Sequence, residues 1–251
     1  MTGCAPDSPK MGIFCATKKE NLDAFGRFIG MIARRYDGAH GNGKINNFII
    51  GNEVNRKQWY NGPFSDPNAW IDSYADFFKV AYDSIILNQP TAHLFISFDH
   101  AFDKRFWDTS TSISLQTFLP IFARLVENRS WRIAYHPYNT DLFNLSFDAR
   151  DTTTSGVITM GTIGMLPGWL RQAFPEKPEV YQDIKLTESG FHSGENATGK
   201  NDQAIALCNS FRNVLGTPGI TTYIYQRMVD NIEEGGLLLG LHTLSGVAKP
   251  A

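Results

Sequence analysis

Two glutamates stand directly after short apolar runs that have the composition of buried strands. Glu53 follows the run at residues 47–51, and Glu188 follows the run at residues 180–186. A solvated helix face does not easily explain a carboxylate in such a position. Glycoside hydrolysis requires two carboxylates across one pocket, one as general acid/base and, in a retaining enzyme, a nucleophile about 5 to 5.5 Å away. A buried glutamate paired with an arginine at a strand end is the structural alternative.

Polar side chains accompany these glutamates at the ends of other apolar runs. His136 and Tyr138 lie two residues apart on an extended segment, so their side chains are expected on the same face. Such donors can orient a carboxylate pair and bind sugar hydroxyls. The predicted substrate-binding residues are Asn52, His100, His136, Tyr138, Tyr225 and Gln226.

Other patterns carry weaker chemical signals. Asp99, His100 and Asp103 resemble a metal cluster only loosely, and Ser189 lacks the GxSxG context of a hydrolase serine. No metal or other cofactor is therefore expected. Aromatic side chains in the loops after strand ends could stack on sugar rings; these are Trp59, Tyr60, Phe102, Trp107 and Phe191.

The elements that position these residues alternate along the chain. Apolar periodicity predicts helices at 22–36, 66–81, 115–126, 163–174 and 203–214, and strands at 47–51, 93–98, 131–135, 180–186 and 220–225. Alternation at intervals of about 40 residues indicates βαβ units and a parallel sheet covered by helices.

An open doubly wound sheet and a (β/α)8 barrel both fit this order. The chain contains no GxGxxG or GxxxxGKS/T turn, which a nucleotide-binding open sheet would show after its first strand. Polar residues follow five successive strands, and in a barrel all strand ends converge on one cavity. These observations favour the barrel.

Three strings resemble motifs of the retaining glycoside hydrolases of clan A. The string Ile49-Ile50-Gly51-Asn52-Glu53-Val54-Asn55 resembles the fourth-strand Asn-Glu motif, which implies Glu53 as acid/base and Asn52 as a contact of the substrate 2-hydroxyl. His136-Pro137-Tyr138 resembles the sixth-strand His-x-Tyr. Leu186-Thr187-Glu188-Ser189-Gly190 resembles the seventh-strand motif and implies Glu188 as nucleophile. The chain also resembles a poorly characterised bacterial family of such barrels, known mainly as a domain of unknown function.

The chain departs from the clan pattern at three places. Tyr225-Gln226 stands where the eighth strand usually ends in an aromatic, often Trp, and the second-strand Arg that pairs with the nucleophile has no counterpart. Gly12 to Ala16 aligns with the end of strand three. The resemblance therefore implies an α/β fold, a TIM (β/α)8-type barrel that lacks its first two strands, as a single domain over residues 1–251. Its open edges would need an N-terminal segment or a partner chain.

Composition limits the partners. The 251 residues carry 23 Lys+Arg against 25 Asp+Glu, a formal charge of −2, which offers no general attraction to nucleic acid or anionic membranes. No segment is apolar enough to span a bilayer. The first ten residues have no signal-peptide pattern, so localisation is open; a secreted or periplasmic location fits an N-terminally truncated chain.

The predicted function is retaining hydrolysis of an oligo- or polysaccharide by Glu53 and Glu188. The loops at 55–66, 101–114, 139–156 and 192–201 are expected to set the sugar and the linkage. The alternative is a carbohydrate-binding or degenerate barrel without turnover, which the missing Arg and Trp favour.

Overall fold

The structure is a computed structural model that describes residues 15–63, 65–103, 111–145, 147 and 156–250. Its contacts cluster into two compact units, unit 1 (Met1–Arg132) and unit 2 (Ile133–Ala251). The expectation of a single domain over the whole chain stays a prediction. Within the described residues, no helix combines the length and the apolar character that crossing a bilayer requires.

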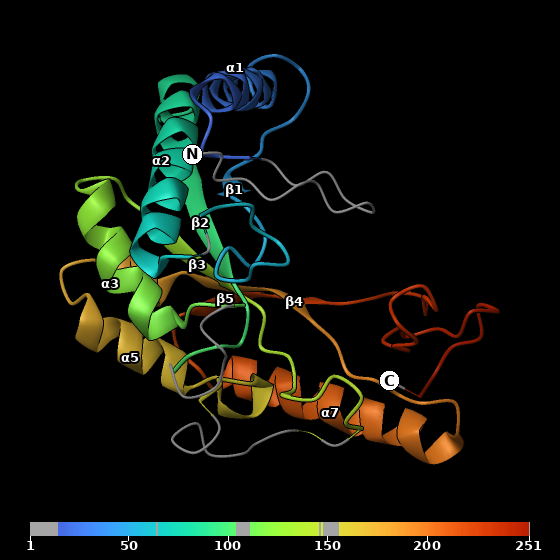
Figure 1. Ribbon diagram of the computed structural model, residues 1–251. Coiled ribbons are helices and arrows are strands. Elements are labelled where there is room, and N and C mark those ends of the chain that lie inside the picture. Colours follow the sequence, from blue (N-terminus) through green and yellow to red (C-terminus); the bar gives the residue numbers. More distant parts are fainter. Residues whose placement is uncertain (1–14, 64, 104–110, 146, 148–155, 251) are drawn as a thin grey trace. The chain divides into compact units, whose positions relative to one another are not determined.

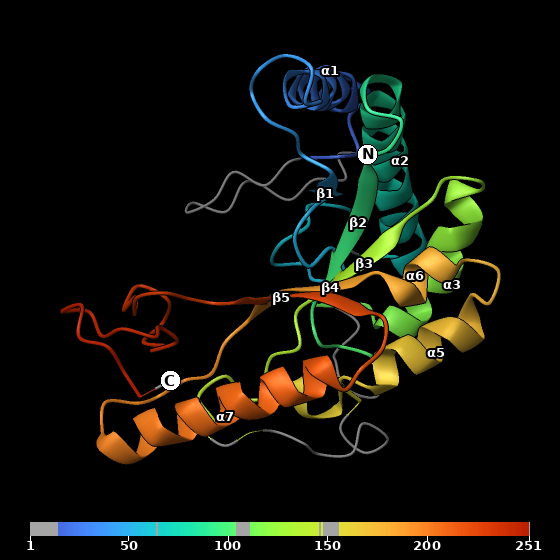
Figure 2. The ribbon, with the colours of Figure 1, turned by 180° about the vertical axis from the view of Figure 1, so that it is seen from behind.

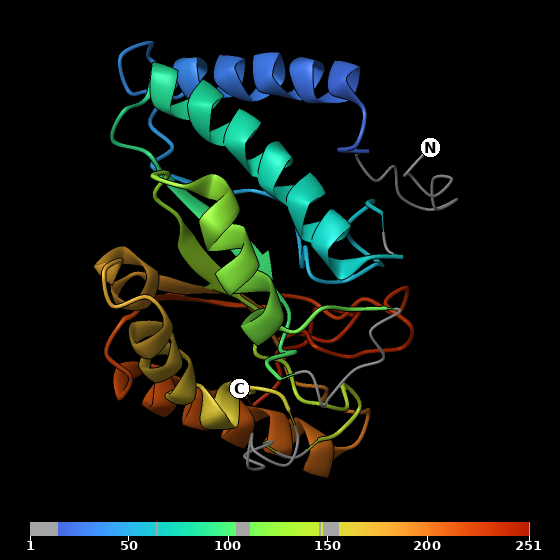
Figure 3. The same ribbon diagram turned by 60° about the vertical axis from the view of Figure 1, so that its left-hand side comes forward.

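Unit 1 contains two parallel strands and three helices. In chain order these are α1 (Lys19–Arg35), β1 (Asn47–Ile49), α2 (Pro67–Asn88), β2 (His93–Phe98) and α3 (Leu115–Val126). β1 pairs with β2 in parallel, with Phe48 opposite Leu94. α1 packs against α2, and α2 packs against α3 (Figures 1 and 3). These elements confirm the predicted helices and strands of this half of the chain.

The aromatic stripe of α2 forms the core of unit 1 and also fixes the segment after β1. Asp66 caps α2 by accepting a hydrogen bond from the N–H of Asn68, with Pro67 in the first turn. The Tyr74 hydroxyl donates to the carbonyl of Ile50 at 2.7 Å. The Trp70 indole N–H donates to the carbonyl of Val54 at 3.0 Å. Both rings are fully buried, so their polar atoms stabilise the core only while these carbonyls stay in place.

Unit 2 contains three parallel strands with helices between them. Its elements are β3 (Arg132–Tyr135, which begins at the unit boundary), η1 (Met160–Thr162), α5 (Met165–Ala173), α6 (Pro178–Gln182), β4 (Ile184–Ser189), α7 (Ala197–Leu215) and β5 (Ile220–Tyr225). Tyr135 of β3 lies opposite Leu186 of β4. Leu186 in turn lies opposite Tyr223 of β5 (Figure 2).

Several boundaries differ from the sequence prediction; α2, for example, continues past residue 81 to Asn88. Residues 178–182 form α6, so the expected strand at 180–186 is wrong in its first part, and β4 begins at Ile184. Pro178 fits the first turn of a helix, and Val180 is buried as it would be in a strand, so apolar character alone did not separate the two. α7 begins at Ala197, because Asn196 caps it by accepting from the Gly199 N–H at 2.8 Å.

Most of the segment that aligns with strand three of the barrel lies outside the described residues. Residues 12–14 of the predicted segment Gly12 to Ala16 are not described. Cys15, the next residue, forms an isolated parallel bridge with Asn61.

A buried ion pair joins the two ends of the segment at residues 228–249, and its lysine also bonds to the loop after β4. The Lys249 ammonium lies 2.8 Å from Asp230 Oδ1, and the two side chains are 1% and 4% exposed. Lys249 Nζ also donates to the Ser193 hydroxyl at 2.9 Å. A charge removed from water in this way is stable only with its partner present.

We expect Asp230→Asn to destabilise the protein by about 3 to 5 kcal/mol, because it leaves the Lys249 ammonium buried without a carboxylate. Thermal denaturation measures the change. Lys19→Ala is the control, since it breaks an exposed pair with Asp23 and should leave the melting temperature almost unchanged. Equal shifts for the two variants would contradict this account.

Candidate functional site

Glu53 is held on a left-handed backbone directly after β1. Its φ is 38°, in a region that residues other than glycine rarely adopt, and Gly51 just before it has a φ of 85°. The Glu53 N–H donates to the Ser97 hydroxyl at 3.1 Å, and the Val54 N–H donates to the Ser97 carbonyl at 3.0 Å. Such a conformation costs about 1 to 3 kcal/mol, and outliers of this kind gather at functional sites.

A buried polar network supports the same loop, and sequence reasoning did not find it. Asn55 Nδ2 donates to Asp99 Oδ1 at 2.6 Å, and the Asp99 N–H donates to Asn55 Oδ1 at 3.2 Å. The Arg56 guanidinium pairs with Asp99 Oδ2 at 3.1 Å. The one sequence signal was the second asparagine of the Asn52-Glu53-Val54-Asn55 string.

The other predicted residues of unit 1 follow the same strand ends. Asn52 is exposed beside Glu53, whereas His100, after β2, is 8% exposed. In the described part of the chain, Asp99, His100 and Asp103 do not form a group with the spacing of metal ligands. The roles of Asn52 and His100 in binding sugar stay predictions.

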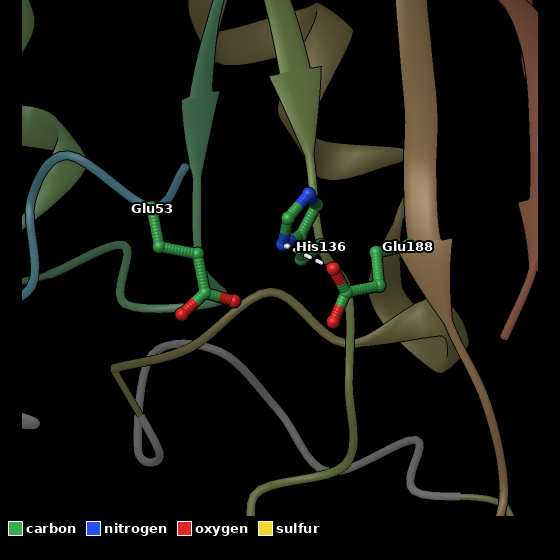
Figure 4. A group of neighbouring side chains, drawn as sticks. All are labelled: Glu53, His136 and Glu188. Atoms are coloured by element: carbon green, nitrogen blue, oxygen red, sulfur yellow. Dashed lines mark ion pairs between the residues drawn. The ribbon is translucent and has the colours of Figure 1, made fainter. Parts of the chain in front are cut away.

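Three predicted residues of unit 2 contact one another around the Glu188 carboxylate. The Tyr138 hydroxyl donates to Glu188 Oε1 at 2.9 Å. His136 Nδ1 lies 3.8 Å from Glu188 Oε2 (Figure 4). Both contacts agree with the expectation that His136 and Tyr138 project to one face. The Glu188 side chain is 34% exposed and His136 only 3%, so the carboxylate is held from one side and open on the other.

A bulge in β4 explains why Glu188 points out of the sheet. Leu186 lies opposite Tyr223 and Ser189 lies opposite Tyr225. Between these two pairs β4 advances by three residues and β5 by two, so β4 contains one extra residue. The alternation of buried and half-exposed residues consequently breaks, and Thr187 and Glu188 are both half-exposed. Bulges of this kind redirect side chains next to functional sites. Thr187, which the sequence did not single out, places its hydroxyl 3.1 Å from His136 Nε2.

The phenol of Tyr225 joins the segment after β5 to α7. Its hydroxyl donates to the Leu239 carbonyl at 3.0 Å and accepts from Gln203 Nε2 at 3.3 Å. Burial raises the pKa of Tyr225 to about 12. The backbone N–H of Gln226 donates to the Ser189 carbonyl at 2.9 Å. Contact of Tyr225 and Gln226 with a substrate stays a prediction.

The aromatic residues proposed for sugar stacking are mostly part of the core. Tyr60, Phe102 and Phe191 are 4%, 6% and 1% exposed, so the expectation that they stack on a substrate is wrong. Trp59 is half-buried, and Trp107 lies outside the described residues.

Comparison with known proteins gives a family and a fold. The family described as "Family of unknown function (DUF5722)" matches residues 8–251. No curated protein matches the chain.

Solved glycosidase structures resemble the chain at low identity. A monomeric β-xylosidase from Caulobacter crescentus CB15 has a TM-score of 0.60 and 15% identity, over 91% of this chain and 45% of that one. A family 1 β-glucosidase from Thermotoga maritima has a TM-score of 0.57 and 10% identity, over 94% of this chain and 67% of the glucosidase. A β-glucuronidase from Bacteroides uniformis has a TM-score of 0.57 and 10% identity, over 98% of this chain and 26% of the glucuronidase.

This likeness shows the fold, an α/β fold of the TIM-barrel type, as the sequence predicts. The chain spans less than half the length of the xylosidase and about a quarter of the glucuronidase. Five parallel strands of such a barrel are present in the described residues.

The left-handed backbone of Glu53 gives a prediction for stability. We expect Glu53→Gly to be more stable than Glu53→Ala by about 1 kcal/mol, because glycine adopts a positive φ without strain. Thermal denaturation of the two variants measures the difference. Glu20, inside α1, is the matched control and should show the reverse order, since alanine favours a helix. The same order at both positions would refute strain at Glu53.

Proposed function

The chain belongs to the family of unknown function DUF5722, and we propose that it is a retaining glycoside hydrolase that acts on an oligo- or polysaccharide. The contact of Tyr138 and His136 with the Glu188 carboxylate is the observation that carries the proposal. His136 and Tyr138 follow β3, and Glu188 is the last residue but one of β4, so all three lie at the carboxyl ends of these strands. In barrels of this type, active sites lie at that face.

Glu188 is the proposed nucleophile. Tyr138 occupies Oε1, so Oε2, which the structure leaves 3.8 Å from His136, is the oxygen available for attack. Its lone pair forms the bond to the anomeric carbon while the glycosidic C–O bond breaks. Water later hydrolyses the glycosyl–enzyme ester and restores the carboxylate.

Glu53 is the proposed acid/base, and this role rests on its motif and its strained position after β1. In the first step it donates a proton to the departing oxygen, and in the second it accepts one from water. The proposal requires its carboxyl group to lie about 5 to 5.5 Å from that of Glu188. Asn52 is the proposed contact of the 2-hydroxyl.

Hydrolysis of a panel of chromogenic glycosides, with NMR of the first-formed anomer, tests the reaction. We expect retention of configuration, and Glu188→Gln should lower kcat by at least about a thousandfold because no glycosyl ester can form. Glu176→Gln is the control, since that exposed glutamate lies between α5 and α6, outside the loops expected to bind the sugar. Undiminished hydrolysis by Glu188→Gln would exclude the nucleophile assignment.

The leaving group separates the role of Glu53 from that of Glu188. Glu53→Ala should lower kcat/KM by about 100- to 10,000-fold for a glycoside with a poor leaving group. It should have a much smaller effect on a 2,4-dinitrophenyl glycoside, whose departure needs no protonation. Equal losses on both substrates would argue against Glu53 as the acid.

A carbohydrate-binding protein without turnover is the second candidate function. No lysine or arginine among the described residues pairs with Glu188, so its charge lacks the cation expected beside a clan A nucleophile. Calorimetry that detects sugar binding by a protein without hydrolysis would favour this candidate.

A further inference from the structure

An aromatic pair, of which Phe143 is exposed and His192 half-buried, lies on the loops that follow β3 and β4. Phe143, after β3, is 51% exposed, so a large part of its aromatic ring is accessible to solvent. Its ring centroid lies 5.2 Å from that of His192, after β4, with the planes at 68°. This edge-on contact leaves much of the Phe143 ring in solvent. We call the two side chains the Phe143–His192 platform.

The loop that carries Phe143 has a defined turn. Asp141 Oδ1 accepts the N–H of Phe143 at 3.0 Å, and the Asp141 carbonyl accepts the N–H of Asn144 at 3.1 Å. Leu145 packs on the loop after β4 and on the first turn of α7, because a Cβ added at Gly194 would meet its Cδ2 at 3.8 Å and one added at Gly199 would meet its Cδ1 at 3.3 Å. The exposed ring therefore stands on a supported segment.

His192 is oriented with a free donor. Its Nδ1 accepts the Leu238 N–H at 3.0 Å, so the proton of the neutral ring resides on Nε2. Burial, and then the charge of Lys249, lower the pKa of His192, so the ring is neutral at pH 7. No other hydrogen-bond partner of this ring occurs among the described residues.

The platform is close to the proposed nucleophile along the chain. His192 follows Glu188 by four residues, which span at most about 14 Å even when fully extended. Phe143 follows Tyr138 by five residues. A short oligosaccharide that reaches Glu188 can therefore also reach the platform.

We propose that the Phe143–His192 platform binds a second sugar ring of an oligosaccharide, beyond the ring attacked at Glu188. This inference rests on the proposed function. The apolar face of a pyranose stacks on the exposed Phe143 ring, and His192 Nε2 donates to a hydroxyl of the same sugar. The platform thereby selects oligosaccharides over monosaccharides.

Calorimetry with the full chain tests the platform, in a Glu188→Gln background that prevents turnover. The ligands are xylotetraose, cellotetraose, xylose and glucose. Phe143→Ala should weaken tetrasaccharide binding about tenfold and leave monosaccharide binding unchanged. Phe143→Tyr, which keeps the ring, should retain the affinity. Phe211→Ala is the matched control, because Phe211 is 50% exposed and edge-on to Tyr223, on α7.

The outcomes separate the platform from the proposed function. Hydrolysis of glycosides together with unchanged tetrasaccharide binding by Phe143→Ala would overturn the platform alone. Loss of tetrasaccharide binding in Phe143→Ala, without any hydrolysis by the wild-type chain, would support the platform and exclude the proposed hydrolase activity. Failure of both tetrasaccharides to bind, or equal losses in Phe143→Ala and Phe211→Ala, would overturn the inference.

Discussion

Parallel pairing of β3 and β4 places His136 and Thr187 beside each other, next to Glu188. Tyr135 lies opposite Leu186, so the next residues on the two strands, His136 and Thr187, are neighbours. A single-residue change of register would turn these side chains to the other face of the sheet. The bulge after Leu186 breaks the regular alternation of side chains at Glu188, while Leu186 and Ser189 on either side remain paired with β5.

Unit 1 positions its glutamate by a different physical means. The hydroxyl of Tyr74 and the indole of Trp70 are buried, and both donate to carbonyls beside Glu53. Burial without these bonds would cost about 1 to 3 kcal/mol for each polar group. The packing of α2 and the backbone of the loop therefore stabilise each other, and this mutual stabilisation offsets the strain at a positive φ.

Periodic patterns predicted the elements because apolar spacing reports burial directly. The same patterns misassigned Val180, whose burial is compatible with both helix and strand. The network of Asn55 and Asp99 was not predictable, since it joins residues 44 positions apart. The sequence also did not predict which loop side chains are exposed. Phe143 and Phe191 both follow strands, but Phe143 is exposed and Phe191 is buried. The strand-end residues were found because residue type and strand position coincide there, whereas the bulge that orients Glu188 has no signature in the sequence.

The ion pair between Lys249 and Asp230 has a consequence for synthesis of the protein on the ribosome. Ser193, which Lys249 contacts, precedes it by 56 residues, so the loop after β4 stays without its partner while those residues are made. Chains fold as they emerge, with earlier parts first. The loop next to Glu188 is consequently among the last parts of unit 2 to be completed, after its strands have been made.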